Sequence, residues 1–295
     1  MLNLKTLDDN YKSLINQSIQ ASIRARKKAG LDLKSPTNID RLCEAYGITV
    51  RFNDINMEGM YEKSSKPRIH VSALRPLARR VFTCVHELGH HIFNHGSSID
   101  ELQDNLYKYK DRPPEEILAD SFAAFTLMPT LGIRHAFNIR KLNPETASAS
   151  EIYAIACNFG VGQATLVNHI HYSLQMISKQ RRDELGKITP KKIRTELLGT
   201  ETSEPLIYVD QYFNASTLDV EVGTMLLLPH KVIVDINMLS PKGSVQNGRI
   251  FQVFKTGITR VMIPGSEWAT YIRVAKQNYV GLARYRHLED EDEDE

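Results

Sequence analysis

The chain has 295 residues, of which 42% are hydrophobic and 24% charged, enough for at least one full hydrophobic core and a length typical of about two domains. The mean hydropathy of -0.32 and the lack of a run of about 18 apolar residues argue against a membrane span, and no segment has the pattern of a secretory signal. The sequence therefore predicts a cytoplasmic globular protein that does not bind membranes.

The cysteines and the charges narrow the class further. Three single cysteines without C-x-x-C spacing, Cys43, Cys84 and Cys157, predict free thiols rather than a disulfide framework or a cysteine-ligated zinc site. The formal net charge of +2 includes seven consecutive acidic residues at 289–295, and without them the rest of the chain carries +9. We expect a disordered acidic tail there and a basic body whose charge alone does not select a partner.

Apolar periodicity predicts a helical N-terminal half interrupted by a small antiparallel sheet. A polar segment at 97–112 lacks this periodicity and predicts a surface loop. Pro113 and Pro114 then favour the start of a helix whose first turn holds Glu115 and Glu116. In chain order, the expected elements are helices at 10–30 and 35–47, strands at 48–52, 59–61 and 68–71, and helices at 74–94 and 113–128.

The second half of the chain predicts two different regions. Residues 150–178 favour two helices about a glycine-containing break at 159–162, a pattern that looks like a helix-turn-helix, and a basic stretch at 179–194 follows. Beyond Gly199, strand-like segments at 225–228, 231–234 and 250–254 and one helix after Ser266 predict a mixed α/β domain. The expected organisation is a domain at 1–145, a helical segment at 146–199, a C-terminal domain at 200–288 and a tail at 289–295.

The sequence His86-Glu87-Leu88-Gly89-His90 matches the H-E-x-x-H pattern inside the predicted 74–94 helix. Residues four apart share one helix face, so both imidazoles can bind one zinc ion, while Glu87 between them can act as a general base toward water. Apolar neighbours predict that this helix is internal, and Gly89 leaves room for a close approach. The pattern favours a metal site over a buried structural histidine pair.

A catalytic zinc ion needs a third protein ligand and one open position. Glu116, in the first turn of the next predicted helix, is the best candidate, and Asp120 one turn later can accept a hydrogen bond from the second nitrogen of a ligand imidazole. Glu115 competes for the ligand role, but it points about 100° away from Glu116 and has no acidic residue four positions on. We therefore expect His86, His90 and Glu116 to bind the metal, Asp120 to support an imidazole and Glu87 to be catalytic.

Two further histidines are expected to lie outside the metal site. His91 is turned about 100° from His90, and His95 lies near the predicted helix end, where packing or capping is its expected role. The metzincin pattern would require Gly at 93 and His at 96, where this chain has Phe93 and Gly96. A donor that stabilises an oxyanion is also needed, and the sequence does not choose among the candidates Tyr107, Tyr109 and His135.

In this order, the motifs resemble the ImmA/IrrE family of metallopeptidases. The resemblance covers about residues 35–130 and is carried by Ile39-Asp40-Arg41-Leu42, Gly47-Ile48, Gly59-Met60-Tyr61, Ile69-His70-Val71, residues 80–91, residues 116–123 and Met128-Pro129. In the family, the equivalents of His86, His90 and Glu116 hold zinc and that of Glu87 activates water. The resemblance implies an α+β fold with a gluzincin-like, mainly helical peptidase domain. In longer members a helix-turn-helix module and a GAF-like sensor domain follow, in the places of 146–199 and 200–288.

The resemblance also implies a function. It points to a cytoplasmic zinc endopeptidase that cleaves a helix-turn-helix transcriptional repressor and so derepresses stress-response, prophage or mobile-element genes. For the basic stretch at 179–194 we weigh DNA contact against a helical layer that packs on the peptidase, and favour the layer because no base-reading set is evident. Zinc is the expected cofactor, with manganese, iron and cobalt left open. A non-cleaving metal-bound regulator and a DNA-binding regulator through residues 150–194 are the alternative functions.

Overall fold

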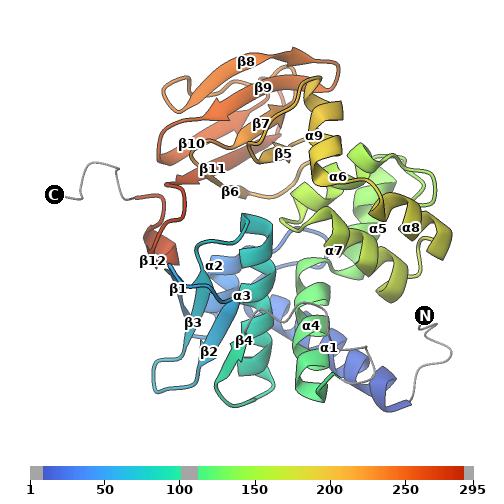
Figure 1. Cartoon of the computed structure of the whole chain (residues 1–295), viewed down its shortest axis with the longest axis vertical. Helices are drawn as coiled ribbons and strands as arrows, with labels where there is room; N and C mark the ends of the chain where they lie inside the picture. Colours follow the sequence, from blue (N-terminus) through green and yellow to red (C-terminus); the bar gives the residue numbers. More distant parts are fainter. Residues whose placement is uncertain (1–8, 101–111, 289–295) are drawn as a thin grey trace. The chain divides into compact units, whose positions relative to one another are not determined.

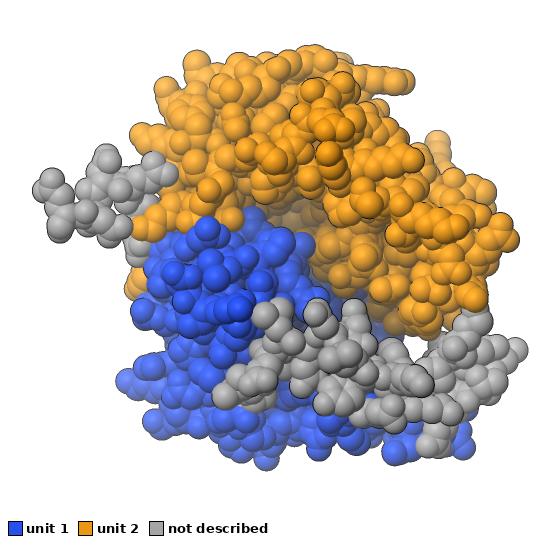
Figure 2. Space-filling model, in the orientation of Figure 1, with its two compact units in different colours: residues 1–132, 278–284 blue, residues 133–277, 285–295 orange. Residues whose placement is uncertain are grey.

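The computed structural model describes residues 9–100 and 112–288, apart from the side chains of 98–100, and the predicted acidic tail lies outside these ranges. The chain has an α+β fold, as the sequence predicts (Figure 1). It divides into two compact units, which Figure 2 shows in different colours. The first contains residues 1–132 and 278–284, and the second residues 133–277 and 285–295. The expected domain boundaries at 145 and 199 both fall inside the second unit.

The helices of the first unit lie close to their predicted positions. They are α1 (Asp9–Lys28), α2 (Ile39–Glu44), α3 (Leu77–Ile92) and α4 (Pro114–Leu127). Helix α2 begins later than expected because Asn38 caps it, its side chain accepting a hydrogen bond from the backbone N–H of Arg41 at 3.0 Å. Helix α4 begins at the Pro113-Pro114 pair, since a proline in the first turn has no N–H to leave unsatisfied.

The sheet of the first unit is mixed, and the prediction of an antiparallel sheet is wrong. Its strands are β1 (Thr49–Asn53), β2 (Gly59–Glu62), β3 (Arg68–Ser72), β4 (Ser98–Asp100) and β12 (Gly281–Leu282), in the order β12-β1-β3-β2-β4. Strand β2 pairs antiparallel with one edge of β3. Strand β1 pairs with the other edge of β3, and these two strands run parallel. Side-chain alternation indicates where a strand lies, but it does not say which strand is its neighbour.

Helices α3 and α4 approach each other closely at Gly89. A Cβ atom at this position would lie 3.0 Å from the Cα of Ala119 and 3.3 Å from the nearest ring carbon of Phe122. Around this contact Val85, Leu88 and Phe122 are completely buried. The glycine therefore permits an interhelical distance that no other residue type would allow without a shift of the backbone.

Buried polar contacts attach α1 to α4. Ser18 Oγ donates a hydrogen bond to the carbonyl of Leu118 at 3.0 Å. The guanidinium of Arg26, which is fully buried, donates to the carbonyl oxygens of Thr126 at 2.7 Å, Asp32 at 2.8 Å and Ser35 at 2.6 Å. Burial lowers the pKa of Arg26 to about 10, so the group is still charged at neutral pH. These contacts fix both halves of α4 against the rest of the first unit.

Helix α5 (Thr130–Ile139) begins directly after Pro129 and runs from the first unit into the second. The helices that follow it are α6 (Ala149–Asn158), α7 (Gln163–Asn168), the π-helix η3 (His169–Ser173), α8 (Lys179–Gly186) and α9 (Pro190–Leu198). The sequence did not predict α5, because Pro129 ends α4 and leaves no polar linker before the next helix. The predicted break at 159–162 does separate α6 from α7, and Gly160 adopts a left-handed φ of 64° there.

Two sheets complete the second unit. Their strands are β5 (Leu206–Tyr208), β6 (Thr217–Glu221), β7 (Met225–Leu228), β8 (Leu239–Val245), β9 (Gly248–Val253), β10 (Gly257–Met262) and β11 (Ala269–Ala275). The orders are β10-β11-β6 and β5-β7-β9-β8. Side chains from both sheets share one buried core, which includes Val220, Leu226, Phe251, Val261 and Ile272. The predicted strands at 225–228 and 250–254 are confirmed.

Other predictions for this region are wrong. Residues 231–234 form no strand and contribute only an isolated bridge between Ile233 and Met262. The helix expected after Ser266 is strand β11, whose alternate residues Thr270, Ile272 and Val274 are buried as a period of two requires. Residues 200–277, all described, contain strands and no helix, and the rest of the expected domain at 200–288 adds only the 3₁₀-helix η4 (Ala283–Tyr285). A GAF-like fold is not confirmed for this region.

Side-chain contacts explain why Gly199 does not divide the second unit. The guanidinium of Arg140 in the loop after α5 makes a bidentate ion pair with Asp210, at 2.7 and 2.8 Å. Asn158 at the end of α6 accepts a hydrogen bond from the backbone N–H of Asn214 at 2.9 Å, and Tyr153 donates to the carbonyl of Leu206. Helices α5 and α6 are therefore attached directly to the segments that carry the strands.

One helical segment of the described chain, Pro114–Ile139, is long and apolar enough to cross a membrane by length and composition. Of its most apolar window, 61% is buried inside the protein, which is ordinary for a core helix. The segment is also interrupted at Pro129, between α4 and α5. It is thus weak support for a membrane span.

The close approach at Gly89 yields a prediction on stability. Gly89→Ala should lower the free energy of unfolding by about 1 kcal/mol, because the overpacking cost of about 1–3 kcal/mol exceeds the helix-propensity gain of about 1 kcal/mol. Gly186→Ala on α8 is the matched control, since a Cβ there meets nothing within 4 Å and should stabilise the helix. Urea unfolding of both variants measures the difference, and an equal gain for the two would contradict the close packing of α3 on α4.

Candidate metal centre

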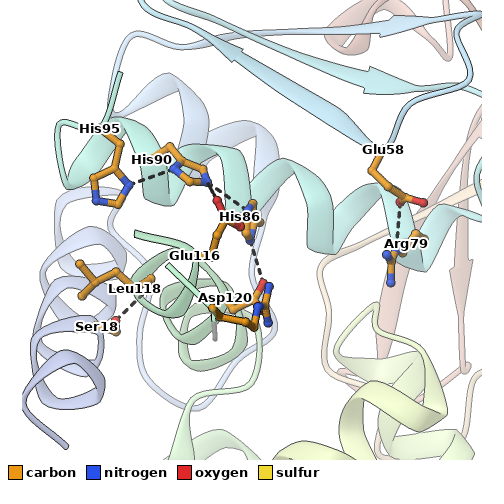
Figure 3. Close-up of polar contacts among 10 residues, drawn as sticks. Ser18, Glu58, Arg79, His86, His90, His95, Glu116, Leu118 and Asp120 are labelled. Carbon is orange, nitrogen blue, oxygen red and sulfur yellow. Dashed lines mark hydrogen bonds and ion pairs between the residues drawn. The ribbon is translucent and has the colours of Figure 1, made fainter. Parts of the chain in front are cut away.

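Helix α3 presents His86 and His90 on one face. Both side chains are buried, with 4% and 2% of the residue surface exposed. Their Nε2 atoms lie 3.1 Å apart, as the four-residue spacing requires for two side chains on successive turns (Figure 3). Val85 and Leu88 on the apolar side of α3 are completely buried, and their burial holds the whole helix, with its two histidines, inside the first unit.

Helix α4 brings Glu116 to the same point. Its carboxylate oxygens lie 3.4 Å from His86 Nε2 and 3.5 Å from His90 Nε2. Ligand atoms about 2.1 Å from a zinc ion at tetrahedral angles lie roughly 3.4 Å apart, so the three measured separations fit one such ion. His86, His90 and Glu116 form the group whose ligand atoms all lie within 4.8 Å of one another. The cluster is therefore compatible with a bound metal ion.

The second nitrogen of His86 is held by Asp120. The distance from His86 Nδ1 to Asp120 Oδ1 is 2.9 Å (Figure 3). The other carboxylate oxygen of Asp120 accepts a hydrogen bond from Arg112. Burial alone would raise the pKa of Asp120, but the hydrogen bond from His86 and the charge of Arg112 lower it below the usual value. An ionised carboxylate can only accept, so the proton of a neutral His86 is on Nδ1 and its Nε2 lone pair faces Glu116.

The remaining charges also favour a cation. Burial and the neighbouring His86 lower the pKa of His90, so its imidazole is neutral near pH 7. Contact with the imidazole of His86, whose Nε2 lies 3.4 Å away, lowers the pKa of Glu116, which is therefore ionised. Two imidazoles and one carboxylate form the donor set that zinc takes in catalytic sites with three protein ligands. The residues present thus fit the group that the sequence predicts.

Glu87 lies on the side of α3 that faces strand β2. Glu87 is completely buried. A Cβ atom at Gly59 would lie 3.1 Å from Oε1 of Glu87 and 2.4 Å from Cγ2 of Thr83. A side chain at position 59 would therefore collide with Glu87 and Thr83, which occupy the space beside the glycine. The backbone of β2 and the turn of α3 at Thr83 together restrict where the Glu87 carboxylate can lie.

Five residues were singled out in the sequence, and the structure brings four of them together: His86, His90, Glu116 and Asp120. The fifth, Glu87, lies between the two histidines on α3. Glu115, the competing assignment, is exposed and not part of the cluster. His91 contacts the hydroxyl of Tyr61 at 2.8 Å instead. Of the candidates for an oxyanion donor, Tyr107 and Tyr109 lie outside the described residues, and His135 is on α5 in the second unit.

The sequence reasoning did not find the contacts of two residues next to the cluster: Arg112 was not singled out, and His95 was expected only to pack or cap near the helix end. Arg112 contacts Asp120, and His95 Nδ1 lies 2.9 Å from Nδ1 of His90. His95 is five positions after His90, a spacing that no regular helix brings together. The signal that indicates the contact is Asn94, a residue type that tolerates the left-handed conformation and so permits a tight reversal at the helix end.

Comparison with known proteins supports the resemblance found in the sequence. Residues 43–170 match the family model Peptidase_M78, described as the IrrE N-terminal-like domain, which supports assignment of this protein to the ImmA/IrrE family. No curated protein matches the chain. A solved structure described as a Mycobacterium tuberculosis transcriptional regulator is 17% identical, covering 59% of this chain and 54% of that one, with a TM-score of 0.36. That likeness is too weak to support an argument about fold or function.

The choice between the two neighbouring glutamates can be tested by metal binding. Glu116→Gln should weaken the affinity for Zn²⁺ by about 100-fold or more, since loss of a ligand costs at least as much as loss of an outer hydrogen-bond partner. Glu115→Gln changes the same charge on the exposed side of α4 and should leave the affinity within about 2-fold. Competition with a chelator of known affinity measures both. Equal losses would contradict the assignment of Glu116.

The packing beside Glu87 can be tested separately. Gly59→Ala should lower the free energy of unfolding by about 1–3 kcal/mol, because the new Cβ would overlap the methyl group of Thr83. Thr83→Ser removes that methyl group and should recover most of the loss in the double variant. Urea unfolding of the single and double variants forms a double-mutant cycle, and strictly additive effects would show that the two side chains do not compete for this space.

Proposed function

We propose that this protein is a metal-dependent endopeptidase. The observation that supports it best is the convergence of His86, His90 and Glu116, whose ligand atoms lie within 4.8 Å of one another in the first unit. The peptidase family to which residues 43–170 match points to the same chemistry. Glu87, on the same helix between the two histidines, is the proposed general base.

Each residue has a distinct part in this proposal. His86, His90 and Glu116 hold the metal, which when bound polarises a carbonyl and makes water a stronger acid. Glu87 takes the proton of the attacking water and delivers it to the nitrogen of the leaving amine. Asp120 accepts from His86 Nδ1 and so keeps Nε2 of that ring available as a ligand. The ionised Glu116 adds negative charge to a site whose other two proposed ligands are imidazoles.

The proposed metal is zinc. Two imidazole nitrogens and one carboxylate oxygen at mutual distances of 3.1, 3.4 and 3.5 Å suit its tetrahedral coordination with one position left open. Imidazole also binds iron and cobalt, and carboxylate binds manganese, so metal analysis of the purified protein is needed to separate them.

The proposed substrate is a protein, a helix-turn-helix transcriptional repressor whose cleavage in the cytoplasm derepresses stress-response or mobile-element genes. This part of the proposal rests on the resemblance to the ImmA/IrrE family. The helix-turn-helix-like segment of this chain does not favour direct DNA binding. Arg181 is engaged with Glu184 at 3.1 Å and Arg182 with Asp183 at 2.8 Å, so two cations of the basic stretch at 179–194 are already partnered by acidic groups.

Glu87→Gln separates the peptidase from the non-cleaving metal-bound regulator. The variant should still bind one metal ion per chain, because Glu87 is not a proposed ligand, but its cleavage rate should fall by about 100-fold to 10,000-fold. Candidate repressors are co-expressed with the wild type and with the variant, and fragments are followed by mass spectrometry.

The outcomes of that experiment are distinct. Cleavage by the wild type alone supports the proposal, and equal cleavage by both proteins excludes Glu87 as the base. A metal-loaded wild type that cleaves no repressor favours the non-cleaving regulator. A wild type that binds no metal refutes the assignment of His86, His90 and Glu116.

A further inference from the structure

Helix α3 ends in a tight reversal directly after the second histidine of the motif. Asn94 adopts a left-handed φ of 57°, its N–H donates to the carbonyl of His91 at 3.1 Å, and the N–H of His95 donates to the carbonyl of His90 at 2.9 Å. These two hydrogen bonds define a Schellman motif in which His90 and His95 are the pair of residues whose side chains meet. That pair is usually apolar, whereas here it consists of two imidazoles.

The two imidazoles make a direct hydrogen bond. Nδ1 of His90 and Nδ1 of His95 lie 2.9 Å apart, with ring centroids at 5.0 Å and an angle of 66° between the planes (Figure 3). One of these nitrogens must donate and the other accept. A metal ligand that uses Nε2 of His90 requires the proton of that ring on Nδ1, which makes His90 the donor and His95 the acceptor.

The reversal itself is held from two sides. The ring of Phe93 stacks on that of His95 with centroids 5.8 Å apart and 21° between the planes. Lys63 Nζ donates to Oδ1 of Asn94 at 2.8 Å, and the backbone N–H of Lys63 donates to Ser97 Oγ at 3.1 Å. Lys63 directly follows strand β2, so the position of His95 is tied to the sheet as well as to α3.

We propose that His95 is a positioning residue for the metal centre: it accepts the Nδ1 proton of His90 and thereby fixes the tautomer and the ring orientation of that ligand. It would do for His90 what the Asp120 carboxylate does for His86. Both imidazoles of the motif would then present Nε2 to the same point. This inference rests on the proposed metal centre, but not on cleavage of any substrate.

Three variants of the full chain test it. His95→Leu removes the acceptor and keeps an apolar side chain, which the Schellman motif favours at this position, so the fold should persist. His95→Asn places Oδ1 where Nδ1 of the imidazole was and keeps an acceptor. His230→Leu, which removes an exposed histidine of the second unit, controls for metal held by surface imidazoles.

The main measurement is Zn²⁺ affinity by chelator competition, with thermal unfolding of the metal-free variants as a check on folding. His95→Leu should bind about 10-fold to 100-fold more weakly than the wild type, the range found for loss of an outer-sphere partner, while His95→Asn should stay within about 3-fold. His230→Leu should not differ from the wild type. In the zinc-loaded wild type, ¹⁵N NMR should place the proton of His90 on Nδ1 and that of His95 on Nε2.

Unchanged affinity in a folded His95→Leu overturns the inference, as does an equal loss in the Leu and Asn variants, since only the acceptor distinguishes them. A zinc-loaded wild type with the His95 proton on Nδ1 overturns it too. If the affinities and tautomers are as expected but no repressor is cleaved, the role of His95 stands and the proposed peptidase function fails. If the wild type binds no zinc, both fail together.

Discussion

The close contact between α3 and α4 at Gly89 is the constraint on which the candidate metal centre depends. His86 and His90 need only the periodicity of one helix to lie together, but Glu116 comes from another. A ligand set with mutual distances of 3.1 to 3.5 Å leaves little tolerance in the separation of the two helix axes. Gly89 against Ala119 sets that separation, because a Cβ at Gly89 would already be 3.0 Å from the neighbouring backbone. The small residue inside the motif is thus as informative as its polar ones.

The polar residues around the cluster follow one rule, which is that each imidazole has a partner for its second nitrogen. Asp120 serves His86 and His95 contacts His90, and both partners come from positions that α3 itself does not determine. Asp120 lies one turn along α4 from Glu116, while His95 is returned to the helix by the left-handed Asn94. Buried polar groups are stable only when such partners are present, so these contacts support the fold and fix the ligand geometry at once.

How much of this could be predicted from the sequence depends on the range of the interaction. The H-E-x-x-H pair and the Glu116–Asp120 pair are each local to one helix, and a period of 3.6 residues was enough to place them. The parallel pairing of β1 with β3 is a choice between distant neighbours, which alternation does not encode. Strand β11 was taken for a helix because a seven-residue apolar segment has no decisive period, and its alternating burial is visible only once the sheet is formed.

The cluster is more easily explained by function than by stability. The lone pairs of two buried imidazole nitrogens and of a half-buried, ionised carboxylate converge within 4.8 Å, where acceptors without a shared proton or cation repel one another. An apolar trio of similar volume would pack the junction of α3 and α4 at lower cost. A bound cation reverses that balance, since a ligand present at 100 times its dissociation constant adds about 2.7 kcal/mol to the free energy of unfolding. The residues that make the first unit costly to fold alone are therefore the proposed metal ligands, and if they bind a metal the stability of this unit should depend on it as much as its chemistry does.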